Sequence, residues 1–89
     1  MTKKDLIELV TRKAHLTKKA STEAVETFLA EIQRALVKGE KVILSGFGTF
    51  DVVQRKEKVM YLRGKQEKVS SHRVASFRAG KTLRRKIKG

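Results

Sequence analysis

Residues 42–50 of the chain are VILSGFGTF, and the spacing of apolar residues changes at this stretch. Before it, apolar residues recur at helical intervals, and after it they alternate weakly with polar ones. Val42-Ile43-Leu44 has strand propensity, and the glycines of Ser45–Phe50 predict a turn into a second strand. Because no Lys-Ser/Thr pair or helix follows, a phosphate-binding loop is disfavoured. The stretch divides one domain, residues 1–89, into a helical dimerisation part, 1–40, and a sheet part, 41–89.

The helical part predicts two helices, over residues 3–14 and 18–38, that form a hairpin. Thr2 and Thr17 stand where N-caps belong, and Gly39 stands where a C′ glycine ends a helix. The apolar stripe of the second helix is too wide and bulky for one short helix to cover. We therefore expect a second copy of the chain to complete a dimer core that contains Val25, Phe28, Leu29, Ile32, Leu36, Leu44, Phe47, Phe50 and Phe77.

The sheet part predicts a long two-stranded ribbon over residues 51–60 and 65–76. Valines are interleaved with Arg and Lys, so neither face is uniformly apolar, and the outer part should stand in solvent. Tyr61-Leu62-Arg63-Gly64 predicts the tip, because glycine supplies the backbone freedom of a turn. Phe77 then returns to the core, and residues 81–88 predict a short helix. The expected fold is α+β: a helical hairpin, a three-stranded antiparallel sheet with a protruding β-arm, and a C-terminal helix.

Positive charge is concentrated in the second half of the chain. The 22 Lys and Arg exceed the 9 Asp and Glu by 13. Residues 51–89 hold 13 basic and 3 acidic residues, whereas residues 1–50 hold 9 and 6. Such a concentrated positive field attracts polyanions, of which nucleic acid is the commonest.

Catalytic and metal-binding patterns are poor. The chain has no cysteine, which excludes disulfides and thiolate metal sites. His15 and His72 are far apart in the sequence, with no nucleophile or orienting carboxylate suggested beside either. No apolar run approaches about 18 residues, and the helical pattern begins directly after Met1, so we expect no membrane span and no signal peptide. We predict a cytoplasmic protein that is not an enzyme and has no cofactor, metal or membrane partner.

The ribbon carries the candidate nucleic-acid contacts. Its guanidinium and ammonium groups can neutralise phosphates, and they belong to Arg55, Lys56, Lys58, Arg63, Lys65, Lys68 and Arg73. Lys3 and Lys81 stand at helix starts, where backbone N–H groups favour phosphate. At the tip, Met60, Tyr61 and Leu62 could enter between base steps as an apolar wedge. Alternatively, Met60 and Leu62 pack on each other across the hairpin.

The order of these elements resembles the HU/IHF family of bacterial histone-like DNA-bending proteins, over the whole chain. The most specific pieces are Lys3 with Leu6-Ile7, the segment Gly46–Phe50, and Gly80-Lys81 followed by Leu83. The resemblance implies an intertwined homodimer, or a heterodimer with a paralogue, whose two arms reach around bent double-stranded DNA. It also implies an architectural, nucleoid-associated function: wrapping or bending DNA with little sequence preference, and so compacting the nucleoid.

The chain departs from the family pattern at the arm tip. The family's Arg-Asn-Pro-x-Thr-Gly, whose proline is the wedge, is replaced by residues 59–64, and the arm is about two residues short. The chain has no proline at all, and Lys58 stands where an arginine is common. The resemblance therefore supports DNA binding more than sharp bending. Site-specific binding, as in the IHF branch, and an RNA-binding or ribosomal function remain alternatives.

Overall fold

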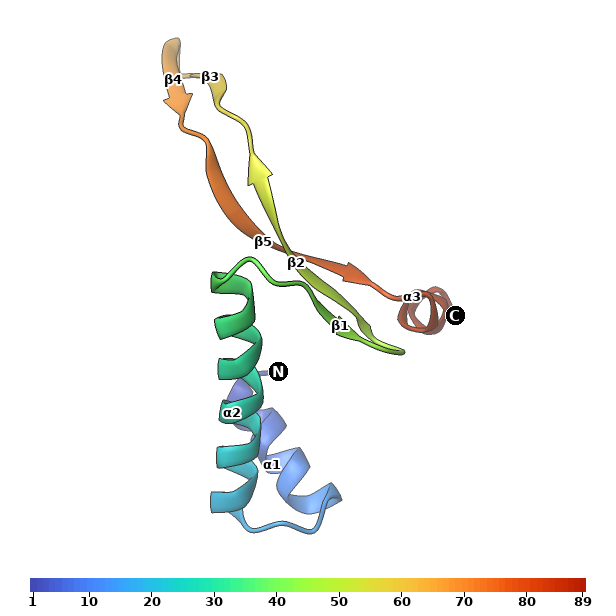
Figure 1. Ribbon diagram of the computed structural model, residues 1–89. Helices are drawn as coiled ribbons and strands as arrows, with labels where there is room; N and C mark the ends of the chain where they lie inside the picture. The colour runs from blue at the N-terminus through green and yellow to red at the C-terminus, as the bar shows by residue number, and fades with distance from the viewer. The chain divides into compact units, whose positions relative to one another are not determined.

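The computed structural model describes all of residues 1–89 and contains three helices and five strands (Figure 1). In chain order these are α1 (Lys3–Lys13), α2 (Lys18–Val37), β1 (Val42–Leu44), β2 (Gly48–Arg55), β3 (Lys58–Leu62), β4 (Lys65–Val69), β5 (His72–Ala79) and α3 (Lys81–Lys88). The predicted α+β class is confirmed. The chain forms two compact units, Met1–Arg34 and Ala35–Gly89, and the boundary between them in the sequence falls within α2.

The first unit is a helical hairpin whose ends are capped as the sequence predicts. The Thr2 Oγ1 accepts a hydrogen bond from the Asp5 N–H at 3.2 Å, and the Thr2 N–H donates to Asp5 Oδ2 at 2.9 Å. Thr17 Oγ1 accepts from the Ala20 N–H at 3.1 Å and so caps α2. These bonds satisfy N–H groups that have no partner within the helix. Of the large apolar side chains, Ile7 alone is buried.

The end of α2 lies in the second unit and has the glycine stop that the sequence predicts. Gly39 has a φ of +82°, a conformation that glycine adopts without the steric cost of a Cβ. The Gly39 N–H donates to the Leu36 carbonyl, and the Glu40 N–H donates to the Ala35 carbonyl, both at 2.9 Å. This pair of bonds is a Schellman motif, which satisfies the last carbonyls of the helix.

The three-stranded sheet has the antiparallel order β1-β2-β5 and explains residues 46–50. The Phe47 N–H donates to the Leu44 carbonyl at 2.9 Å, and Gly46 completes this turn with a φ of +82°. A Cβ on Gly48 would lie 2.6 Å from the Phe77 ring and 2.7 Å from the Arg78 carbonyl oxygen. Glycine at position 48 therefore lets the Phe77 ring pack directly on the backbone of β2.

Three aromatic rings gather on one face of this sheet. The ring centroid of Phe77 lies 5.4 Å from that of Phe47 and 4.8 Å from that of Phe50, both in tilted arrangements. The cluster is incompletely covered, because 42% of Phe77 and 47% of Phe47 are exposed in the single chain. In the first unit Phe28 is likewise 54% exposed. Each unit thus leaves large apolar side chains accessible.

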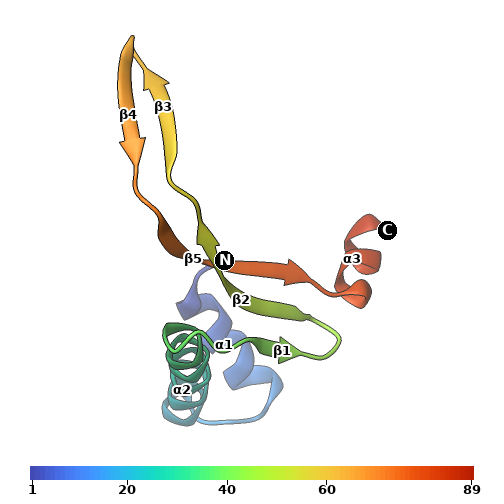
Figure 2. The same ribbon diagram turned by 45° about the horizontal axis from the view of Figure 1, so that its top comes forward.

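The arm extends beyond this sheet, and its strands are shorter than the sequence predicts (Figure 2). The prediction of continuous strands over 51–60 and 65–76 is wrong, because β2 ends at Arg55 and β3 begins at Lys58, while β4 ends at Val69 and β5 begins at His72. Side chains bridge the break: Gln54 Nε2 donates to Ser71 Oγ at 2.7 Å, and His72 Nδ1 lies 2.9 Å from the Ser70 carbonyl oxygen.

The tip is a two-residue turn, shorter than the predicted tetrapeptide. Leu62 pairs with Lys65, so Tyr61 and Leu62 belong to β3 and only Arg63 and Gly64 make the turn. Both turn residues have positive φ, +52° for Arg63 and +76° for Gly64. This is the conformation of a type I′ turn, whose twist matches that of the flanking antiparallel strands.

The C-terminal helix α3 begins and ends where the sequence predicts. The Gly80 N–H donates to the Phe47 carbonyl at 2.8 Å, which attaches the start of α3 to the β1–β2 turn. A Cβ on Gly80 would lie 3.2 Å from that carbonyl oxygen, closer than side chains usually come. Figure 2 shows α3 at the end of β5 opposite to the end that continues into the arm.

Candidate nucleic-acid interface

The outer arm presents its cations on both faces of the β3–β4 ladder. All ten residues of these two strands are exposed. Side chains alternate between faces along a strand, and directly paired residues share a face. The register therefore places Lys58 and Lys65 on one face and Lys68 on the other. An arm of this kind can reach phosphates on either side of a groove.

The bulky tip residues also lie on two different faces. Met60 and Leu62 share one face, opposite Glu67 and Lys65, whereas Tyr61 lies on the other, opposite Gln66. The interpretation that Met60 and Leu62 pack on each other across the hairpin is wrong, because both belong to β3. Tyr61 is 76% exposed and Met60 is 38% exposed. Tyr61 is therefore the bulky tip side chain most accessible to another molecule.

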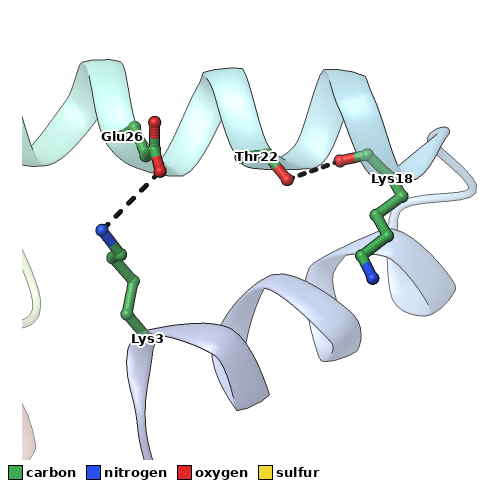
Figure 3. Close-up of polar contacts among 4 residues, drawn as sticks. All are labelled: Lys3, Lys18, Thr22 and Glu26. Atoms are coloured by element: carbon green, nitrogen blue, oxygen red, sulfur yellow. Dashed lines mark hydrogen bonds and ion pairs between the residues drawn. The ribbon is translucent and has the colours of Figure 1, made fainter.

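Two of the predicted contact residues have acidic partners in the free chain. Lys3 Nζ, at the start of α1, lies 3.6 Å from Glu26 Oε1 on α2 (Figure 3). In the arm, Lys68 Nζ lies 2.8 Å from Glu57 Oε1. All four side chains are at least half exposed, and exposed pairs of this kind contribute about 0–1 kcal/mol. A phosphate can therefore displace either carboxylate at low cost.

Arg73 differs from the other predicted contact residues. Its Nη2 donates to the Val37 carbonyl at 3.0 Å, at the C-terminal end of α2. The last carbonyls of a helix lack partners within the helix and carry partial negative charge, which favours a cation there. This contact joins residues 36 positions apart, so no local pattern could have revealed it. Arg73 thus ties β5, at the root of the arm, to the end of α2.

The remaining predicted contact residues with positive charge have no ion-pair partner: Arg55, Lys56, Lys58, Arg63, Lys65 and Lys81. Three of them, Arg55, Lys56 and Lys58, line a hollow of about 390 Å³ beside the break in the arm. His72 also lines this hollow and pairs directly with Arg55 in the β2–β5 register. The sequence pattern gives His72 no part in DNA binding, because only the strand register brings it beside Arg55.

Other kinds of site have no support in the structure. No three His, Asp or Glu side chains gather in positions that could hold a metal ion. None of the helices combines the length and apolar composition that a membrane crossing would require. The concentration of exposed, unpaired cations on the arm defines a polyanion-binding protein.

The comparisons with known proteins agree with this class. Residues 1–88 match the family model described as bacterial DNA-binding protein. The chain is 41% identical to DNA-binding protein HU of Staphylococcus aureus (strain COL), over 99% of this chain and all of that protein. It is 38% identical to integration host factor subunit alpha of Aliivibrio fischeri (strain MJ11), over 98% of this chain and 91% of that protein.

The solved structures agree as well. An Anabaena HU–DNA cocrystal structure matches with a TM-score of 0.91 and 34% identity, covering 98% of this chain and 97% of that one. HU from Thermotoga maritima matches with a TM-score of 0.72 and 36% identity, covering 98% of both chains. The chain therefore belongs to the HU/IHF family of bacterial DNA-binding proteins, whose role is architectural.

Proposed function

We propose that two copies of the chain form a homodimer that binds double-stranded DNA through both arms, with little sequence preference. The observation that carries this proposal is the exposed arm, in which five cations have no acidic partner: Arg55, Lys56, Lys58, Arg63 and Lys65. The outer arm has no core of its own, so among the parts of the chain it would gain the most stability from a partner that covers it. Wrapping or bending of DNA, compaction of the nucleoid and a cytoplasmic location are parts of the same proposal.

The homodimer is supported by how much surface the single chain leaves uncovered. Large apolar side chains in both units remain exposed, with exposed fractions of 54% for Phe28, 46% for Leu29 and 42% for Phe77. All three belong to the predicted dimer core. Covering these side chains with a second copy removes apolar surface from water.

The salt dependence of DNA affinity tests the binding mode. Each phosphate neutralised by a cation releases counterions, so the logarithm of the affinity should fall linearly with the logarithm of salt concentration, with a slope of about −0.9 per contact. We expect a slope steeper than about −4 on a random-sequence duplex, since two arms contribute. An affinity that is nearly independent of salt would contradict binding through the arm cations.

Site-specific binding is the second candidate, supported by the similarity to integration host factor subunit alpha. It differs from the main proposal in one measurable quantity, the ratio of affinities for a selected sequence and for random duplex. Selection from a random-sequence pool followed by competition would measure this ratio. A ratio near one supports the main proposal, and a ratio of about 10³ or more supports the site-specific alternative.

Structured RNA is the remaining alternative ligand. Double-stranded RNA has a deep, narrow major groove and a wide, shallow minor groove, which differ from the grooves of B-form DNA. We expect a DNA duplex to displace an RNA duplex of equal length and sequence. Preferential retention of the RNA would favour the ribosomal or RNA-binding interpretation. We also propose that the chain itself catalyses no reaction, in keeping with the architectural role of the family.

A further inference from the structure

The break in the arm ladder creates a hollow with a distinctive lining. It lies where β2 passes into β3 and β4 passes into β5, and its volume is about 390 Å³. Met60 and Val69 supply apolar surface, while Arg55, Lys56 and Lys58 supply positive charge. Cations beside apolar surface suit an anionic group attached to a less polar one, such as a phosphate with its deoxyribose.

The acidic residue in the lining does not cancel this charge. Glu57 also lines the hollow, but its Oε1 lies 2.8 Å from Lys68 Nζ. The Glu57 carboxylate is therefore already balanced by a cation of β4. Arg55, Lys56 and Lys58 have no acidic partner in the chain, so three positive charges remain available to an incoming anion.

His72 is the fourth basic group of the hollow, and its orientation is set by a hydrogen bond. Its Nδ1 lies 2.9 Å from the Ser70 carbonyl oxygen. A carbonyl only accepts hydrogen bonds, so Nδ1 carries the proton. In the neutral ring Nε2 then has a lone pair and no proton, and this lone pair repels an anion. In the protonated ring Nε2 becomes a donor while the bond to Ser70 is kept.

The charged groups around His72 leave these donor and acceptor roles of Nδ1 and Nε2 unchanged. Arg55 faces the ring from β2, and Lys58 lies in the lining from β3, with Lys56 and Glu57 between these strands. From β4 the lining residue is the uncharged Val69. Arg73, the next residue in β5, donates instead to the Val37 carbonyl.

We propose that Arg55, Lys56, Lys58 and His72 form a binding site for one DNA phosphate, and that His72 takes up a proton when the phosphate binds. This inference rests on the proposed DNA binding and adds a dependence on pH. Because binding takes up a proton, affinity rises as pH falls through the range in which histidine titrates, between about pH 8 and pH 5. Because a dimer has two arms, it can take up as many as two protons when it binds DNA.

The test is the affinity for a random duplex between pH 7.5 and 5.5 at constant ionic strength. We compare the unmodified protein with His72→Gln and with the matched control His15→Gln, which changes the other histidine of the chain, in the turn between α1 and α2. We expect the affinity of the unmodified protein and of His15→Gln to rise about tenfold over this range, and that of His72→Gln to rise less than about threefold.

The outcomes separate this inference from the proposed function. Equal pH dependence in His72→Gln and the unmodified protein would overturn the role of His72 while leaving DNA binding intact. Failure of the unmodified protein to bind DNA at any pH would overturn both. Should His72→Gln fail to fold, NMR titration of the His72 ring in the unmodified protein decides: the duplex should move its titration to higher pH, and an unmoved titration would contradict the proposal.

Discussion

The β2–β5 and β3–β4 ladders of the second unit have the same antiparallel backbone pairing but differ in what covers them. In the base, β2 and β5 pair over eight residues from Gly48 to Arg55, and the Phe47, Phe50 and Phe77 rings pack on one face. In the outer arm, β3 and β4 pair over five residues, and every side chain is exposed. The base is held by side-chain packing, and the outer arm by its backbone ladder and turn.

This difference indicates a division of roles. Apolar packing supplies most of the stability of a folded chain, and an isolated two-stranded hairpin is marginally stable in water. Substitutions in the base should therefore change stability, whereas substitutions in the outer arm should change DNA binding. Four predictions test this division.

Phe77→Ala should have the largest effect on stability. Phe77 contacts the other two rings of the base, and loss of a packed aromatic side chain costs about 3–5 kcal/mol. Thermal denaturation followed by circular dichroism measures the loss. Tyr61→Ala, which removes an aromatic ring from the outer arm, is the matched control and should cost less than about 0.5 kcal/mol. Equal destabilisation by both variants would contradict the comparison.

The double variant Arg63→Asn with Lys65→Gln should weaken DNA binding without changing the melting temperature. Asn tolerates the positive φ of position 63, so the turn is retained. The salt slope is the slope of the logarithm of DNA affinity against the logarithm of salt concentration. Each lost phosphate contact reduces its magnitude by about 0.9, or by up to about 3.6 for the four positions in a dimer. The control is the double variant Lys13→Gln with Lys19→Gln, which removes the same charge from the helices. A comparable decrease of the salt slope in this control would contradict a phosphate contact at the tip.

Arg73→Gln should destabilise the root of the arm rather than remove a phosphate contact. Loss of the hydrogen bond to Val37 is expected to cost about 1 kcal/mol, measured by chemical denaturation, and Arg73→Lys should recover part of it. The salt slope of DNA binding should be unchanged in both variants. A lower slope with unchanged stability would restore Arg73 to the phosphate-contacting residues.

Tyr61→Ala should have the smallest effect on affinity but a measurable effect on DNA bending. Tyr61 is the bulky tip residue most exposed to a duplex, and a wedge acts by unstacking base steps. Energy transfer between dyes at the ends of a bound duplex should report a smaller bend for Tyr61→Ala than for Met60→Ala. The reverse order would assign the wedge to the face that carries Met60 and Leu62, and no change in either variant would exclude a wedge.

The features that the sequence predicts correctly depend on neighbours within a few residues. Thr2 and Thr17 cap helices through bonds to residues three positions away, and Gly39 ends α2 through bonds to the preceding turn. No sequence pattern marks the break at Lys56-Glu57 and Ser70-Ser71, because the composition of the ribbon is continuous through it. The sequence predicts a four-residue tip, whereas the structure has a two-residue turn. The difference arises because the pairing of Leu62 with Lys65 depends on the turn type.

Local patterns in the sequence are enough to predict the helices and their capping residues, the order of elements, and the concentration of charge on the arm. Each of these follows from local propensity, hydrogen bonds within one turn, or simple counting. By contrast, the hydrogen bond from Arg73 to the end of α2 and the position of His72 beside Arg55 depend on how the chain folds. Such contacts join distant residues, and their geometry depends on strand register, so no local pattern contains them.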